Sequence, residues 1–202
     1  MYQSARYQAG GPVASGQSLS GQANGIIKCG MVNFTGKNIN ATNGSRTYIT
    51  TCPVVGDTLV MDPYGFDTGI GNDFTQPQTS YLHYRKAVIL SVTPQVNPNK
   101  PTTGLTADTN SVTQSFTGQV FVAFDMIAVP VNTDGSGTNI ALGDLLMVQN
   151  GSYRLVSATG YPASANSQAN WKATQACCAI ALAASTTAGA QILASYGIGQ
   201  CI

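Results

Sequence analysis

The only histidine of the chain, His83, is the first residue to consider for acid–base or nucleophilic chemistry. An imidazole titrates near neutral pH and is the usual general base beside a serine nucleophile. The sequence contains no G-x-S-x-G element, the strand-to-helix turn that presents a catalytic serine. The residues from Tyr81 to Arg85 alternate as in a strand. We therefore interpret His83 as a structural or contact residue and predict no catalytic residues, although a hydrolase hidden in the scaffold would need it.

Aspartates in one stretch could hold a cation. Asp62, Asp67 and Asp73 are interspersed with glycines, and carboxylate oxygens are the ligands that Ca²⁺ prefers. Their spacing does not match the D-x-D/N-x-D/N-G pattern of a calcium loop, and Asp-Pro and Asn-Asp pairs are also typical of turns. We therefore predict turns and no metal site. Residues 134–137, Asp-Gly-Ser-Gly, are likewise interpreted as a turn, because no strand and helix flank them as in a phosphate-binding loop.

Cysteines offer a second possible chemistry. The chain has five of them: Cys29, Cys52, Cys177, Cys178 and Cys201. Their number is odd, and no pair has the C-x-x-C spacing of many metal and redox sites. Adjacent residues of a strand point to opposite faces, which disfavours a metal shared by Cys177 and Cys178. We expect free, buried thiols that pack as small apolar groups, and no cofactor.

Charge is the strongest signal in the composition. The chain has no glutamate, 8% charged residues and a net charge of +1, whereas an ordinary domain has about 25% charged residues. Soluble surfaces normally use mixed charge to avoid association, so this surface suits contact with other protein. The basic residues are scattered and give no electrostatic footprint for nucleic acid. We therefore expect a protein partner and no nucleic acid.

Apolar runs in the sequence are short. The longest, residues 176–184, is far below the roughly 20 residues that a membrane-spanning helix needs. The first residues of the chain contain no apolar run of the kind found in a secretory signal. We expect a protein without membrane association that folds in a reducing compartment.

The elements that must position these residues are strands. Thr, Val, Ile and Tyr, which favour strands, are plentiful, and the charged helix formers are depleted. The predicted fold class is all-β, with a small β-barrel-like or β-sandwich-like core. Residues 1–25 form an extended N-terminal arm, and residues 26–202 form a single β domain. Loop excursions at 62–83 and 93–117 interrupt that domain.

Strands are predicted where apolar and β-branched residues cluster: 26–34, 46–52, 58–61, 87–92, 119–128, 145–149, 152–156, 176–184 and 191–198. The alanines of 176–184 also allow a helix, but no capping residue flanks the run, so we prefer a strand. Within 119–128, counting by twos places Phe124 and Met126 on one face and Asp125 on the other.

The clearest local signal is Asn150-Gly151 between two apolar runs. Such a pair predicts a tight hairpin, because both central residues of a type I′ turn take positive φ. Gly143 and Asp144 lead into the first of these runs, and Gly189 lies in the turn before the last predicted strand.

The order of these C-terminal pieces resembles that of small capsid decoration (cement) proteins of tailed bacteriophages. The resemblance covers residues 118–202 and hardly extends to residues 1–117. Its motifs are L-G-D-L-L, the N-G hairpin, A-I-A-L-A-A-S, T-A-G-A and the final strand. The resemblance implies a non-enzymatic homotrimer on the outside of a phage head, bound to the major capsid protein. Its location would be the virion exterior, after assembly in the host cytoplasm.

A long N-terminal arm suits this role. Its anchors, Tyr2, Arg6 and Tyr7, are of the types enriched at interfaces, so we predict that they contact capsid or a neighbouring subunit. The alternatives are a tail or fibre component, or a receptor- or glycan-binding β module of a virion. A fibre should show sequence repeats, which are absent, and a glycan module should expose several aromatics, whereas the chain has only Trp171 as tryptophan.

Overall fold

The computed structural model describes residues 26–35, 37–39, 46–48, 52–63, 73–92, 101–102, 105–108, 115–136, 139–158 and 176–197. Regular structure in these ranges is nearly all strand, which confirms the all-β class. A short 3₁₀ helix, η3 (Thr79–Tyr81), is the helical element that precedes the sixth strand. The predicted contact residues Tyr2, Arg6 and Tyr7 lie outside the described residues, as does Trp171.

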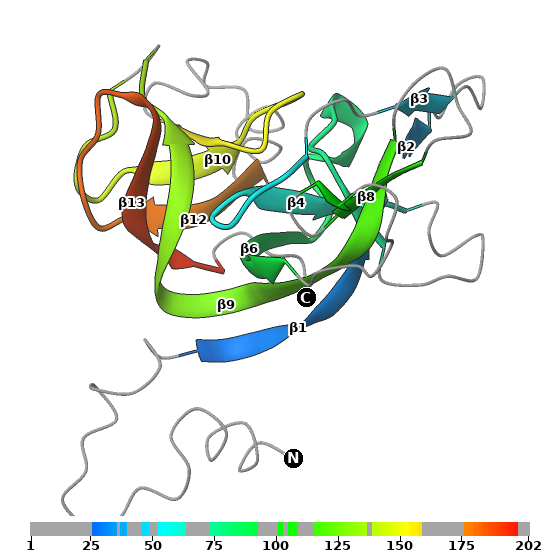
Figure 1. Cartoon of the computed structure of the whole chain (residues 1–202). Helices are drawn as coiled ribbons and strands as arrows, with labels where there is room; N and C mark the ends of the chain where they lie inside the picture. Colours follow the sequence, from blue (N-terminus) through cyan, green and yellow to red (C-terminus); the bar gives the residue numbers. More distant parts are fainter. Residues whose placement is uncertain are drawn as a thin grey trace, which may run out of the picture.

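The described strands follow one another along the chain as shown in Figure 1. They are β1 (Ile26–Phe34), β2 (Lys37–Ile39), β3 (Arg46–Tyr48), β4 (Thr58–Met61), β5 (Asp73–Thr75), β6 (Lys86–Val92), β7 (Pro101–Thr102), β8 (Leu105–Asp108), β9 (Ser115–Asp134), β10 (Leu145–Val148), β11 (Leu155–Ser157), β12 (Cys177–Ala181) and β13 (Ala188–Tyr196).

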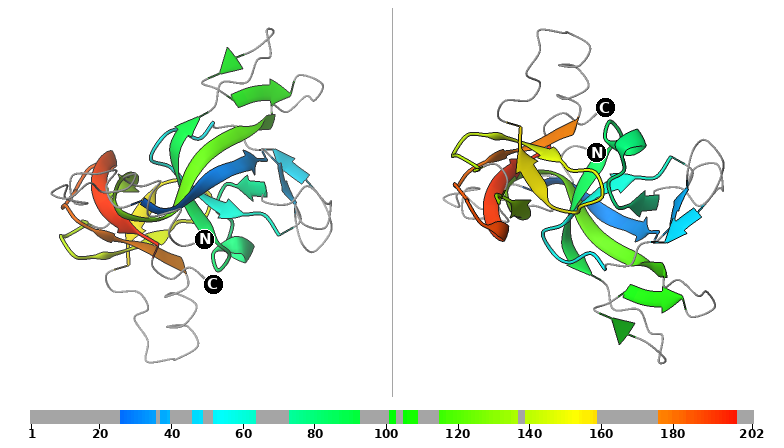
Figure 2. Two further views of the ribbon diagram at one scale, coloured as in Figure 1. Left: turned by 90° about the horizontal axis from the view of Figure 1, so that it is seen from below. Right: turned by 90° about the horizontal axis from the view of Figure 1, so that it is seen from above.

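Within the described ranges, the strand pairings close two rings that share β9 (Figures 1 and 2). The first barrel runs β1–β5–β4–β6–β9 and closes because β9 also pairs with β1. The second barrel runs β9–β11–β10–β12–β13 and closes because β13 pairs with β9. Closure matters because it removes most of the exposed strand edges that invite uncontrolled pairing.

β9 serves both barrels because its register shifts at its middle. Lys28 of β1 pairs with Asp125, but the next residue, Cys29, pairs with Ala123, so Phe124 is an extra residue in β9. Such a bulge bends a strand and increases its twist, and β9 turns sharply between the barrels in Figure 1. The bend lets one continuous strand line two separate cores.

Each barrel has its own apolar core. The first contains Val32, Phe34, Leu59, Phe74, Ala87, Ile89, Val120, Val122 and Tyr153. The second contains Val60, Tyr81, Val88, Ala123, Met126, Val129, Val131, Ile140, Leu146, Val148, Leu155, Cys178, Ala179, Ala181, Ile192, Ala194 and Tyr196. β6 contributes Ile89 to the first core and Val88 to the second. A strand buried on both faces reads as a continuous apolar run, as this one does.

The bulge also corrects one prediction from the sequence. Counting by twos placed Phe124 and Met126 on one face of a regular strand. In the structure Phe124 packs against the first core, whereas Met126 belongs to the second. Asp125 is half-buried, and its carboxylate lies next to Gly197, where a Cβ would come within 2.5 Å of Oδ1. Period-two counting fails here because the extra residue changes which side chains face inward.

The predicted hairpin exists, but its turn is wider than the sequence predicted. Val148 pairs with Leu155, so residues 149–154 form the loop in place of a tight two-residue turn. Ser152 N donates to Gln149 O at 3.3 Å, and Gly151 takes φ 72°. The tight turn is excluded because Tyr153 leaves the β-ladder to fill the first core. β12 confirms the strand preferred over a helix at 176–184.

Both predicted loop excursions contain regular structure. β5 and η3 lie within 62–83, and β7, β8 and the first residues of β9 lie within 93–117. The structure also corrects the strand-like interpretation of residues 81–85, because His83 lies in the turn after η3. Its ring is exposed and stacks on Tyr84 with centroids 4.4 Å apart.

Cysteine burial follows the prediction only in part. Cys177 and Cys178 are buried free thiols on β12, as expected. Cys52 is half-buried and Cys29 is exposed, because Cys29 lies on the outer side of β1. Cys201 lies outside the described residues.

Candidate functional site

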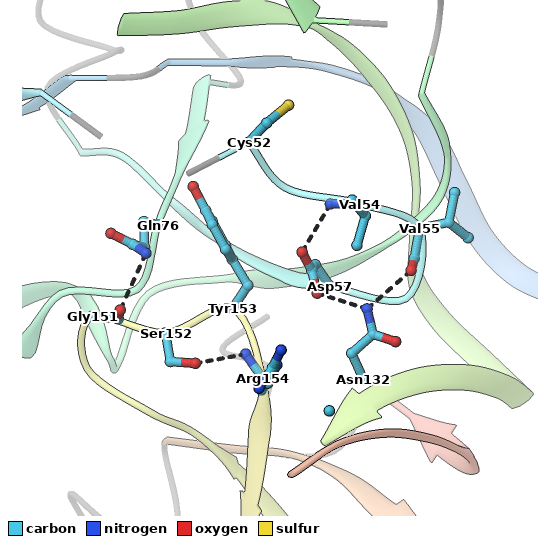
Figure 3. A pocket seen from close by; sticks show the side chains of 11 residues that line it. Cys52, Val54, Val55, Asp57, Gln76, Asn132, Gly151, Ser152, Tyr153 and Arg154 are labelled. Carbon is cyan, nitrogen blue, oxygen red and sulfur yellow. Dashed lines mark hydrogen bonds between the residues drawn. The ribbon is translucent and has the colours of Figure 1, made fainter. Parts of the chain in front are cut away.

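A cavity of about 520 Å³ lies where the two barrels meet (Figure 3). Its walls come from the turn before β4, from β9, from the β10–β11 loop and from the start of β13. The lining residues are Cys52, Val54, Val55, Asp57, Gln76, Asn132, Gly151, Ser152, Tyr153, Arg154 and Gly189. Concave sites with a few convergent polar groups are the usual place for ligands and contacts, so this cavity is the candidate site.

The turn before β4 forms the floor of the cavity. Asp57 N donates to Val54 O at 3.0 Å, and Val54 N donates back to Asp57 Oδ2 at 2.8 Å. Gly56 occupies the third position of this turn with φ 88°, which a side chain would resist. A Cβ at Gly56 would also lie 2.8 Å from Asn132 Oδ1, so the sequence Gly-Asp is required by conformation and by space.

Asn132 of β9 fastens this turn to the second barrel. Its Nδ2 donates to Val55 O at 3.0 Å and to Asp57 Oδ1 at 2.7 Å. Its Oδ1 accepts a bond from Gln191 Nε2 at 3.2 Å, and its backbone N donates to Gly56 O at 2.7 Å. One amide side chain therefore ties the first barrel to β9 and to β13, as Figure 3 shows for the turn.

The β10–β11 loop is held by the first barrel from the other side. Gly151 N donates to Pro77 O at 2.8 Å, and Gln76 Nε2 donates to Gly151 O at 3.2 Å. Thr58 N donates to Tyr153 O at 2.9 Å. The walls of the cavity are thus hydrogen-bonded to each other across the barrel junction, which makes the cavity a rigid feature.

Asp57 is a structural acceptor in this network. Burial raises the pKa of its carboxyl group, and the bonds from Asn132 and Val54 and the charge of Arg154 lower it in part. Both carboxylate oxygens already accept hydrogen bonds within the protein. A base needs an oxygen that can reach a substrate proton, so the geometry disfavours Asp57 as a general base.

The thiol and phenol of the lining are held neutral. Burial raises the pKa of Cys52, and the negative charge of Asp57 raises it further. The same two causes, burial first, raise the pKa of Tyr153. Since the thiolate is the nucleophile, Cys52 is poorly placed for nucleophilic catalysis at neutral pH. The cavity is suited to contact through neutral hydrogen-bonding groups.

Arg154 is the cation of the lining. Its side chain is exposed, and its guanidinium lies over Gly189, where a Cβ would come within 3.2 Å of Cζ. Its charge lowers the pKa of Asp57 and of Asp134. Gly189 therefore serves two needs, its own φ of 77° and room for the guanidinium. It lies inside β13 at a register shift and not in the turn that the sequence predicted.

The structure brings only some of the predicted motif residues together. Gly151 and Gly189 line the cavity, whereas Gly143, Asp144 and Asn150 do not. Gly143 takes φ 86° in the loop before β10. Asp144 Oδ2 there accepts bonds from Ala141 N at 2.9 Å and Ser157 Oγ at 2.7 Å. The L-G-D motif is therefore a structural brace between strands.

Two central residues of the site escaped the sequence analysis. Asp57 was interpreted only as part of a turn, although its position directly after Gly56 was a usable signal. Asn132 carries no local signal, because its partners are far away in the sequence. Arg154 was considered a partner of Asp125, but it lies by Gly189.

Other sites and matches were sought beyond the cavity. Among the described residues, no three His, Cys, Asp or Glu side chains gather as a metal ion would require, and Asp67 lies outside these residues. No helix in the described part of the chain is long and apolar enough to cross a bilayer. Comparisons with protein-family models, with curated proteins and with solved structures found no match.

Proposed function

We propose that the protein is a structural component of a virion, which binds the outside of a phage capsid as a trimer and stabilises the shell. One observation carries the proposal: large apolar side chains are exposed on a chain with 8% charged residues. Among the described residues, those exposed by 42–72% are Met31, Val54, Val55, Ile127, Leu142, Leu145, Leu182 and Leu193. Apolar surface without charge around it is typical of a surface that other protein covers.

The barrel junction supports a structural role. A protein that stabilises a shell must transmit force between contacts, and the Asn132–Asp57 bond and the shared strand β9 join the barrels without a flexible linker. The raised pKa values of Cys52 and Tyr153, both caused chiefly by burial, favour neutral contact groups over catalytic ones.

A threefold arrangement would strengthen attachment. Three linked copies present three sets of contacts at once, and each contact after the first forms at a high effective concentration. Individually weak contacts of uncharged polar and apolar groups then suffice for stable binding. The resemblance of residues 118–202 to capsid decoration proteins points to the same arrangement.

The proposal is tested with phage heads that lack the protein. Purified full-length chain is mixed with these heads, and binding is measured by co-sedimentation, with light scattering of the free protein to give its mass. We expect a mass of three chains, saturable binding, and heads that withstand a higher temperature before they release DNA. A control with heads already carrying the protein should bind none. A monomer that ignores the deficient heads would contradict the proposal.

A further inference from the structure

Apolar side chains gather on the outer face of the second barrel, the side away from β4 and β6 in Figure 1. Leu182 N donates to Leu193 O at 2.9 Å, and Leu193 pairs with Pro130 of β9. On the neighbouring strand Leu145 pairs with Ile180. We call the set Pro130, Leu142, Leu145, Ile180, Leu182 and Leu193 the apolar outer face.

The strand pattern explains why these side chains point outward together. Ala181 and Ala194 are buried in the second core, so their neighbours Leu182 and Leu193 face the other way. Leu145, Leu182 and Leu193 are 44%, 42% and 48% exposed. Leu142 is 72% exposed and lies next to Gly143, whose N donates to Ala181 O at 2.8 Å. Side chains on adjacent strands at this spacing form one continuous patch.

No charge interrupts this face. β10, β12 and β13 read LLMV, CCAIA and AGAQILASY, without a single Asp, Lys or Arg. The outward neighbours of Leu193 along β13 are Gln191 and Ser195, which are uncharged and polar. An apolar centre with an uncharged polar border has the composition of a homo-oligomer interface, which is more apolar than the contact between proteins that also exist apart.

We infer that the apolar outer face is the surface on which a second copy of this chain packs. The inference rests on the proposed function, in which the subunits form a trimer. In a symmetric assembly each residue meets residues of the same surface or a neighbouring one, so a charged face would repel its copy. A face without charge meets its copy without that penalty. The resulting burial excludes water from the exposed leucines.

The test compares two aspartate substitutions in the full chain. Leu193→Asp places a carboxylate at the centre of the face, where the leucine is 48% exposed. Val55→Asp is the matched control, because Val55 is 47% exposed but lies in the turn at the cavity. The mass of each protein is measured by light scattering over about a hundredfold range of concentration. We expect trimers for the natural chain and Val55→Asp, and monomers for Leu193→Asp.

The outcomes separate the two proposals. A trimeric natural chain whose Leu193→Asp variant stays trimeric overturns the inference and leaves the proposed function standing. A natural chain that is monomeric at every concentration overturns the trimer itself. If Leu193→Asp fails to fold by circular dichroism, Leu193→Gln replaces it. This milder change should raise the dissociation constant by about 30-fold, the loss typical of a buried interface anchor, and an unchanged constant would overturn the inference.

Discussion

Asn132 Nδ2 lies 2.7 Å from Asp57 Oδ1 and 3.0 Å from the carbonyl oxygen of Val55, and these two bonds connect the first barrel to β9. Asn132→Ala removes both donors and leaves buried Asp57 with one acceptor unsatisfied. We expect a loss of about 2–4 kcal/mol in the free energy of unfolding, since an orphaned buried polar group costs its full desolvation. Urea unfolding followed by circular dichroism measures it. Asn139→Ala, at an exposed position, is the control and should change stability by less than about 0.5 kcal/mol.

Asp57 also gives stability an unusual pH dependence. Burial is the main cause that raises its pKa above the usual 3.8, so the folded state binds this proton more readily than the unfolded state. Between the unfolded and the folded pKa, the folded state therefore binds more protons, and the contribution of Asp57 to stability falls as pH rises above 3.8. We expect the stability difference between the natural chain and Asp57→Asn to change in that window and to be flat below it.

Asp134 provides the opposite sign for comparison. Its bonds from Ser136 are the main cause that lowers its pKa below 3.8. Its contribution is therefore present above 3.8 and is lost as pH falls through its folded pKa. Asp134→Asn, measured over the same pH series, should remove this acid-side loss. The same pH slope in both variants would contradict the assignment.

Glycine substitutions separate conformational strain from lack of space. Gly151 takes φ 72° with open space around it, so Gly151→Val should cost about 1–2 kcal/mol through strain alone. Gly56 takes φ 88° and a Cβ there would meet Asn132 and Gln191, so Gly56→Ala should cost more, about 3 kcal/mol. Gly30→Ala is the control, since no atom lies within 4 Å of the added Cβ. Thermal unfolding ranks the three, and an equal cost for Gly30 and Gly56 would refute the explanation.

Thiol labelling tests the burial of the cysteines. Cys29 is exposed, whereas Cys178 is fully buried and burial raises its pKa to about 12. At pH 8 the folded protein should therefore react with a thiol reagent at Cys29 and not at Cys178. Mass spectrometry of peptides identifies the labelled sites, and unfolding in urea should release Cys178 for reaction. Fast labelling of Cys178 in the folded state would contradict the closed second core.

Deletion of residues 1–20 tests the arm. It removes Tyr2, Arg6 and Tyr7, and we expect it to leave the thermal unfolding of the free protein unchanged while weakening attachment to heads. The reason is that a segment poor in large apolar residues adds little to a core but can add contacts with a neighbour. The triple change of the three anchors to serine is the matched variant of full length. An equal loss of stability in the free protein would show that the arm belongs to the core.

The sequence predicted what depends on local patterns. Strands β1 and β4 have the bounds that alternation and turn residues indicated, and the Asn150-Gly151 signal correctly marked a hairpin. The all-β class followed from β-branched residues and the scarcity of charged helix formers. These features are predictable because a few neighbouring residues determine them.

Features that depend on distant partners were missed. The bulge at Phe124 arises from the need of β9 to serve two cores, which no window around β9 reveals. The cavity depends on bonds such as Asn132 to Asp57, which lie 75 residues apart in the sequence. The wide hairpin loop exists because Tyr153 fills the core of the other barrel. Tertiary packing overrode local preference in each case.

The shared strand β9 has a consequence for the evolution and engineering of the chain. Neither half can be cut out as an independent module, because excision of one barrel would strip the other of a wall. We therefore expect one calorimetric melting peak, with equal calorimetric and van't Hoff enthalpies. Insertions should be tolerated in the connections between strands, whereas a stop codon or a protease cut near Val129 would abolish both halves together.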